Sequence, residues 1–341
     1  MKLHKKILII TSFLLILSVF INADVNKTYA WGPTTHMYMT WSQALNQTDS
    51  TITRIIKNNF DWFSCGLMYP DVSVIYYYTN FTSYRSTHNI AQFYAGLWND
   101  AIKRNSEQAK AFTLGVGTHM IQDSVVHNSY IPTKIRTSLV RNNIIHPVIE
   151  GIIEGRLASD YKESKALAED AFARWDDPFT DSGMDGMTPV QWADSILKLS
   201  GASSFQDEAS TFENILLGGN FKLSFMGYAF ISQKGGLWDI FRGVGDIVKV
   251  FIPYEESKSY IDESISVTVQ WYATGDGSAD SLGQYVKGDP SGENALAQAD
   301  VFVTNWTIVI LIIFSIIMIY YFHRKSKTGL PLLKKIVSKE D

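Results

Sequence analysis

The sequence of 341 residues is long enough for one large folded domain or two small ones between its hydrophobic ends. Of its 30 Lys and Arg, four lie in residues 1–30 and six in residues 323–341; of its 34 Asp and Glu, those segments hold one and two. The part between them therefore carries a charge of about −11 with His neutral, which disfavours duplex nucleic acid as a partner. Bound divalent cations would offset part of this charge. The single cysteine, Cys65, excludes an internal disulfide.

The first 30 residues are predicted to be a secretory signal peptide. Three lysines within the first six residues precede an apolar run over residues 7–21, and a polar stretch then ends at Ala30. A basic start, an apolar centre and a small residue before the cleavage point are typical of such a signal. Cleavage after Ala30 would make Trp31 the first residue of the mature chain. An uncleaved signal anchor is the alternative.

A second apolar run predicts a transmembrane helix over residues 305–322. Its roughly 18 residues are near the lower limit for spanning the hydrocarbon core, and Trp306, Tyr320 and Tyr321 stand at its edges, as in an aromatic belt. The basic tail over residues 323–341 is expected in the cytoplasm by the positive-inside tendency. We therefore expect a single-pass protein of the cell membrane with its domain on the extracytoplasmic side. Its own membrane is a predicted partner, and no protein partner is predicted.

Between these ends, residues 31–273 are predicted to form one all-α domain. Apolar residues recur at helical spacing over residues 107–128 and 141–161, among others, and no internal repeat is evident. Residues 60–84 are rich in aromatics and contain a proline, so we interpret them as a loop with short helical turns. Residues 274–304 turn to Gly, Ser and Asp and predict a flexible acidic linker with a reach of roughly 30 Å.

The domain has five histidines, and each stands in a setting that favours metal binding. His119, Asp123 and His127 follow at intervals of four, so on an α-helix their side chains fall within an arc of about 80°. His146 and Glu150 repeat this spacing, and imidazole and carboxylate are the donors of zinc sites. A single pair would as readily be a buried histidine beside a carboxylate. Two pairs close together, extended by His127, favour a metal site.

The predicted cleavage point adds a further metal candidate. Cleavage would give Trp31 a free α-amino group, which titrates near neutrality and can lose its proton to a metal ion. The Trp31 carbonyl could close a five-membered chelate, and His36 follows five residues later. The alternative is that Trp31 is simply a buried aromatic residue.

These motifs occur in an order that resembles the zinc-dependent phospholipase C family. The order is a mature start Trp-Gly-x-x-Thr-His, a Pro-Asp at 70–71, an isolated His88, a His-x-x-x-Asp-x-x-x-His helix and a His-x-x-x-Glu helix. It is also similar to the catalytic domain of the glycosylphosphatidylinositol-specific phospholipase D and to secreted zinc-dependent single-strand nucleases. The resemblance implies an all-α domain of this phospholipase C and nuclease type that binds three zinc ions.

The resemblance also implies which residues hold each ion. One zinc would take the Trp31 amino nitrogen and carbonyl, His36 and Asp123; a second would take Asp71, His88, His119 and the bridging Asp123; the third would take His127, His146 and Glu150. Asp61 is an alternative to Asp71, and Glu154 is an alternative to Glu150. Asp71 and Asp123 are the catalytic candidates, with Asp71 either a ligand only or also the base that orients water.

The expected reaction is that of a phospholipase C, which hydrolyses a phospholipid to diacylglycerol and a phosphorylated headgroup. Gly32, Pro33 and Thr34 supply no acidic residue behind Trp31, so a choline preference is in doubt. Alternatives on the same metal site are a single-strand nuclease or nucleotidase and a phospholipase D-type cleavage. A zinc-binding adhesion module without catalysis is the non-enzyme alternative. The negative charge counts against a nucleic acid substrate without excluding it, and the predicted membrane helix favours a phospholipid.

Overall fold

The computed structural model describes residues 31–75, 86–138, 142–202 and 254–303, together with 305–306, 309–310 and 312–313. Within these ranges the chain is helical, and none of the described residues forms a strand. The predicted signal peptide, the predicted cytoplasmic tail and most of the predicted membrane helix lie outside the described residues. Among the helices that are described, none is both long and apolar enough to cross a bilayer.

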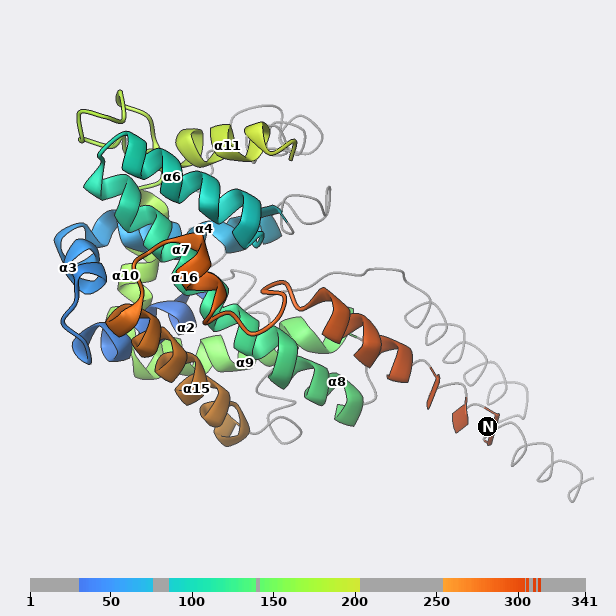
Figure 1. The fold of residues 1–341 in the computed structure, drawn as a ribbon. Coiled ribbons are helices and arrows are strands. Elements are labelled where there is room, and N and C mark those ends of the chain that lie inside the picture. The colour runs from blue at the N-terminus through green and yellow to red at the C-terminus, as the bar shows by residue number, and fades with distance from the viewer. Residues whose placement is uncertain are drawn as a thin grey trace, which may run out of the picture.

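The domain is built around α7 (Glu107–Val125), whose side chains from Ala111 onward are all buried. In Figure 1, α6 and α11 lie on one side of α7, while α8, α9 and α15 lie toward the other. The elements, in chain order, are α2 (Pro33–Met37), η1 (Tyr38–Gln43), η2 (Ala44–Asn46), α3 (Thr51–Asn58), α4 (Phe60–Ile75), η3 (Ile90–Tyr94), α6 (Ala95–Lys103), α7, η4 (Val126–Tyr130), α8 (Ile131–Ser138), α9 (Asn142–Asp160), α10 (Lys162–Ala173), α11 (Pro189–Leu199), α15 (Tyr254–Thr274) and α16 (Ala279–Gly283).

Helices α4 and α7 cross in direct backbone contact, and two glycines make this possible. A Cβ on Gly66 would lie 1.9 Å from the Phe112 carbonyl oxygen, and a Cβ on Gly115 would lie 2.1 Å from the Phe63 carbonyl oxygen. Any larger side chain at either position would push the two helices apart. This close crossing sets the position of α4 relative to α7, the two helices that carry most of the first cluster described below.

The loop expected over residues 60–84 is wrong for residues 60–75, which form α4. Gly66 and Pro70 lower the intrinsic helix propensity of this stretch. The side chains of residues 63–70 are nevertheless buried against the neighbouring helices, as Phe63 and Tyr69 show. Tertiary packing therefore outweighs local propensity here.

Buried apolar side chains form two clusters. The first lies among α4, α6, α7, α10 and α11 and includes Phe63, Phe112 and Trp192. The second lies among η4, α8, α9 and α15 and includes Tyr130 and Ile149. Together they hold the helices that carry the candidate metal ligands at fixed positions.

Residues 274–304, expected to be a flexible linker, instead pack against the domain over much of their length. They contain α16 and a helical stretch over residues 293–303, drawn in red-orange in Figure 1, whose far end leads away from the domain. This stretch buries Leu296, Ala299 and Val303 in the second apolar cluster. The three recur at spacings of three and four, on one helical face. The Gly, Ser and Asp residues before them hide this signal in the composition.

Candidate metal centre

The first group of metal-type side chains gathers around Asp123 on α7. Asp123 Oδ2 lies 2.8 Å from His119 Nε2 and 3.3 Å from His88 Nε2. Asp123 Oδ1 lies 3.2 Å from Nε2 of His36, which is on α2. Asp71 on α4 lies 3.7 Å from His119 Nε2 and 3.9 Å from His36 Nε2. Three histidines and two carboxylates, brought from four parts of the chain, therefore share one small space, which we call the Asp123 cluster.

The second group consists of His127 on η4 with His146 and Glu150 on α9, and we call it the Glu150 cluster. Their ligand atoms all lie within 4.8 Å of one another, and all three side chains are buried. Glu150 Oε1 lies 2.6 Å from His146 Nε2. A histidine pair with one carboxylate is a donor set that zinc sites use.

His119, Asp123 and His127 were expected on one helix face, with His127 at a different ion by the family resemblance, and the structure places His127 in the Glu150 cluster and the other two in the Asp123 cluster. α7 ends at Val125 and continues without a break into η4, a π-helical turn. A π-helical turn has more residues per turn than an α-helix, so side chains beyond it point in a different direction. The π-helical turn thus accounts for His127 facing α9 while Asp123 faces α2 and α4.

Trp31, the remaining expected ligand, is fully buried at the start of the described chain. Its ring stacks on Tyr130 with 6.1 Å between ring centroids. Two residues later the chain enters α2, which carries His36. The structure therefore places Trp31 beside the helix that bears a cluster histidine, and an anchored aromatic ring fixes it there.

Neither of the two alternative ligands joins a cluster. The Glu154 carboxylate accepts hydrogen bonds from the Thr34 and Thr35 backbone N–H groups at 2.7 and 3.0 Å and from the Thr35 hydroxyl at 2.9 Å. Its oxygens are engaged with the first turn of α2. Asp61 is half exposed and pairs with Arg174 at 3.0 Å. Asp71 and Glu150, not Asp61 and Glu154, are the carboxylates that reach the clusters.

Hydrogen bonds on the far side of the rings prepare two histidines to bind a metal. His119 Nδ1 donates to the Leu67 carbonyl at 3.0 Å, and His127 Nδ1 donates to the Pro290 carbonyl at 2.8 Å. A carbonyl can only accept, so in both neutral rings Nδ1 carries the proton and Nε2 carries the lone pair. Metal-binding histidines in proteins are held in this way.

Several buried polar atoms of the clusters make no hydrogen bond. They are His36 Nε2, Asp123 Oδ1 and both carboxylate oxygens of Glu150. His36 Nε2 and Asp123 Oδ1 are only 3.2 Å apart, yet the contact lacks hydrogen-bond geometry. Buried polar groups are nearly always satisfied, so donor atoms that converge without bonding each other fit a shared cation. The residues of both clusters therefore fit a bound metal ion.

The electrostatics of the site also call for a cation. Burial raises the pKa of Glu150 well above its usual range, and the nearby Asp123 and Asp71 raise it further. Burial likewise raises the pKa of Asp71. Burial acts to raise the pKa of Asp123 too, but His119 and His36 outweigh it and hold that pKa well below its usual range. Burial lowers the pKa of His119 to about 3. A divalent ion would supply the positive charge that these carboxylates lack.

A helical domain with two groups of histidine and carboxylate donors has the arrangement expected of a metal-binding protein. Residues 35–185 match the family model described as zinc dependent phospholipase C, so this segment is similar to that family. The match confirms the resemblance drawn from the ligand pattern and implies that the metal is zinc. It includes every expected ligand except Trp31, which lies just upstream. No curated protein and no solved structure matches the chain.

Sequence reasoning missed Gln122, which supports the Asp123 cluster from within α7. Its side-chain carbonyl accepts a hydrogen bond from His36 Nδ1 at 2.7 Å, and its amide nitrogen donates to the Thr40 hydroxyl at 3.0 Å. This amide fixes the ring of His36 as the backbone carbonyls fix His119 and His127. A glutamine beside Asp123 carries no distinctive sequence signal, because the contact depends on how α2 packs against α7.

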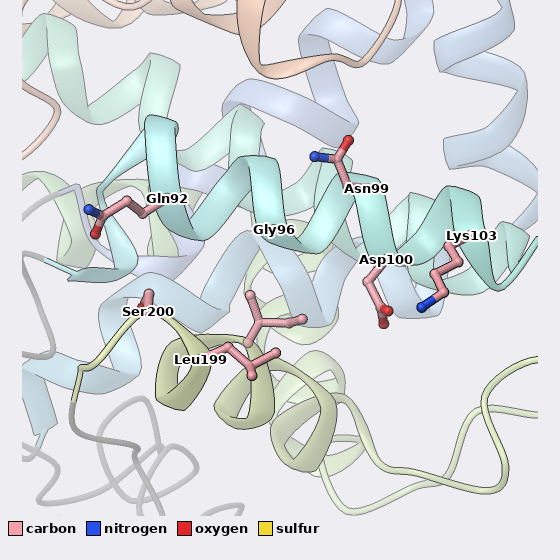
Figure 2. A pocket seen from close by; sticks show the side chains of 8 residues that line it. Gln92, Gly96, Asn99, Asp100, Lys103, Leu199 and Ser200 are labelled. Atoms are coloured by element: carbon pink, nitrogen blue, oxygen red, sulfur yellow. The ribbon is translucent and has the colours of Figure 1, made fainter.

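A separate hollow of about 520 Å³ opens between α6 and α11. Figure 2 shows Asp100 and Lys103 of α6 on one side of it and Leu199 and Ser200 on the other, with Gln92 of η3 at one end. None of the residues that line it belongs to either cluster. The candidate centre is therefore defined by the two clusters and not by this hollow.

Proposed function

We propose that the protein is a membrane-anchored, extracytoplasmic phosphodiesterase of the phospholipase C type that works with three zinc ions. The observation that carries the proposal is the convergence of histidine Nε2 atoms and carboxylate oxygens at the two clusters, inside the segment that matches the family. The proposed zinc ligands are Trp31 through its amino nitrogen and carbonyl, His36, Asp71, His88, His119, Asp123, His127, His146 and Glu150. Asp123 would bridge two ions, because its two oxygens face different histidines.

Zinc in such a site brings the pKa of bound water toward neutrality and counters the negative charge of phosphate oxygens. The chain itself supplies the arrangement around that chemistry. His119 and His127 each donate from Nδ1 to a backbone carbonyl and hold their Nε2 atoms toward the centre. The Asp71 side chain is 13% exposed while those of His36, His119 and Asp123 are fully enclosed, which favours the Asp71 side for the approach of substrate. Asp71 is thus placed to orient water or accept its proton.

The proposed substrate is a phospholipid, cleaved to diacylglycerol and a phosphorylated headgroup. The membrane helix expected over residues 305–322 supports this, since it would hold the domain near bilayer headgroups. The net charge of about −11 outside the two ends also favours a lipid over a polyanionic strand. A nuclease or nucleotidase, a phospholipase D-type cleavage and a non-catalytic zinc module remain as outcomes of the test.

The test is a product assay on the mature full-length chain, beginning at Trp31 and held in detergent. Mixed phospholipids and, separately, single-stranded DNA and RNA are supplied with and without a chelator. We expect diacylglycerol release that the chelator abolishes and that Asp123→Asn lacks. Asp61→Asn, which changes an acidic side chain on α4 outside the cluster, is the matched control and should match the unaltered protein.

Other products would redirect the proposal. Phosphatidic acid would indicate cleavage on the other side of the phosphate. Cleavage of DNA or RNA with lipids untouched would make the protein a nuclease. Zinc binding without turnover of any of these substrates would favour the adhesion module, and absence of bound zinc would contradict the proposal as a whole.

A further inference from the structure

Residues 287–292, which follow α16, wrap around the end of α7 and the start of η4; we call them the 287–292 segment. The Lys287 backbone N–H donates to the Ser124 hydroxyl at 2.9 Å, and the Asn128 amide donates to the Asp289 carbonyl at 2.6 Å. Between these contacts, the Pro290 carbonyl accepts the hydrogen bond of His127 Nδ1. The segment therefore holds the chain on both sides of His127 as well as its ring.

The 287–292 segment is braced internally. The Asp289 carboxylate accepts hydrogen bonds from the Ser291 backbone N–H at 3.0 Å and from the Ser291 hydroxyl at 2.6 Å. The Asp289 carbonyl accepts another from the Gly292 N–H at 2.8 Å. A carbonyl held by such a turn points in one direction, so it can fix the orientation of the imidazole that bonds to it.

Gly292 lies against His127 with no room for a side chain. Its φ of +63° is in the left-handed region that favours glycine, and a Cβ added there would lie 2.3 Å from His127 Cβ and 2.8 Å from the His127 carbonyl oxygen. Any other residue at this position would be strained and would push the segment away from η4. Glycine here thus serves the contact with a proposed metal ligand.

The helical stretch that follows anchors the 287–292 segment to the same part of the domain. Leu296, Ala299 and Val303 are buried in the apolar cluster that also contains Ile149 and Ile153 of α9. α9 carries His146 and Glu150. One continuous length of chain therefore contacts His127 directly and packs in the same core as the helix that bears the other two residues of the Glu150 cluster.

We propose that the 287–292 segment positions His127 for metal binding, through the Pro290 carbonyl, and so sets the affinity of the Glu150 cluster for its ion. The inference rests on the proposed function in one respect, that this cluster holds zinc. The inference goes beyond the proposed function because the 287–292 segment lies outside residues 35–185 and leads toward the expected membrane helix. The segment that leads toward the expected membrane helix would then also support the metal centre, because loss of the Pro290 contact would free the His127 ring to turn.

The experiment compares Gly292→Ala with Gly186→Ala in the mature full-length chain. Gly186 also has a left-handed φ, of +72°, but a Cβ there would meet nothing within 4 Å, so it reproduces the backbone strain without the contact. Zinc per chain is measured by mass spectrometry after dialysis against graded chelator. Cobalt substitution gives a visible spectrum for the ions that bind. Circular dichroism follows the fold.

We expect Gly292→Ala to bind one ion about 10- to 100-fold more weakly than the unaltered protein, the usual effect of disturbing the partner of a metal-binding histidine. The other ions and the helical signal should be retained, and Gly186→Ala should match the unaltered protein. Asn128→Ala, which removes the donor to Asp289, should weaken the same ion to a smaller extent.

Two results would overturn the inference. One is an identical chelator titration for Gly292→Ala and Gly186→Ala. The other is a uniform loss of all ions together with helicity, which would make the segment a general stabilising element. Failure of the proposed function itself would look different, because the unaltered protein would then bind no zinc.

Discussion

The two clusters differ in how the chain builds them, although both use histidine and carboxylate. The Asp123 cluster is assembled mainly by α2, α4 and α7, and its Asp71 side chain is 13% exposed. The Glu150 cluster is fully enclosed and takes part of its support from the 287–292 segment, far along the chain. A cluster with a shared carboxylate, Asp123, and a partly exposed one, Asp71, suits a reacting centre, and an enclosed triad suits a tightly held ion. By this comparison the Asp123 cluster would carry the reaction, while the Glu150 cluster would hold an ion that adds positive charge to the site.

The largest expected effect separates the two clusters by metal count. Asp123→Asn removes the carboxylate charge that two ions would share, so it should lose two of the three proposed zinc ions and at least about 100-fold in activity, beyond the upper range for a supporting residue. Glu150→Gln should lose one ion, because no second group depends on it. Zinc per chain and initial rates check both. Equal metal losses in the two variants would show that the clusters do not differ in this way.

The next effect concerns the crossing that positions Asp71. Gly66→Ala would place a Cβ 1.9 Å from the Phe112 carbonyl oxygen, where only backbone movement can relieve the overlap. We expect a loss of about 3 kcal/mol in the free energy of unfolding, the upper part of the usual range for overpacking. Urea denaturation measures it. Gly283→Ala in α16, where a Cβ meets nothing within 4 Å, is the control and should be neutral or slightly stabilising. Equal stability in both variants would contradict the tight crossing.

A smaller effect tests the residue that joins the two regions. Glu154 lies on α9 with Glu150, yet its carboxylate holds the first turn of α2, which carries His36. Glu154→Gln keeps the shape but leaves only one side-chain oxygen to accept the bonds of α2. We expect about 1–3 kcal/mol lower stability and weaker zinc at the Asp123 cluster. Chelator titration with cobalt-loaded protein distinguishes the ions. Weakening confined to the Glu150 cluster would show that Glu154 serves its own helix instead.

The sequence predicted which residues gather in the two clusters more successfully than it predicted the groups that support them. Spacing of four residues identified His119, Asp123, His146 and Glu150, because helix geometry relates sequence distance directly to side-chain direction. It could not predict that a π-helical turn would divert His127. Nor could it identify the Leu67 and Pro290 carbonyls, since every residue carries such a group and only tertiary packing selects one.

The fold shows the same division between local signals and packing. Long periodic stretches predicted α7 and α9, whose apolar residues repeat at helical spacing. α4 was misjudged because Gly66 and Pro70 disfavour a helix locally, while close packing against α7 stabilises it. The segment before the expected membrane helix was misjudged for the opposite reason. Its Gly, Ser and Asp residues indicate flexibility, but in the structure three of them, Asp289, Ser291 and Gly292, form the braced turn beside His127.

The smallest effect concerns a residue away from both clusters, Cys65 on α4. Burial raises the pKa of its thiol, which donates a weak hydrogen bond to the Ala171 carbonyl of α10 at 3.3 Å. A raised pKa means that at pH 8 less thiolate is present than in an exposed cysteine, and full burial also denies access to reagents. We expect a disulfide exchange reagent to leave the native protein unlabelled at pH 8 and to label one thiol per chain in denaturant.

Removal of zinc should not change this labelling, because α4 and α10 pack in the first apolar cluster, which contains none of the proposed metal ligands. Rapid labelling after chelation alone would instead show that the metal centre holds the whole domain closed, and the two regions would then be less independent than their separate supports indicate.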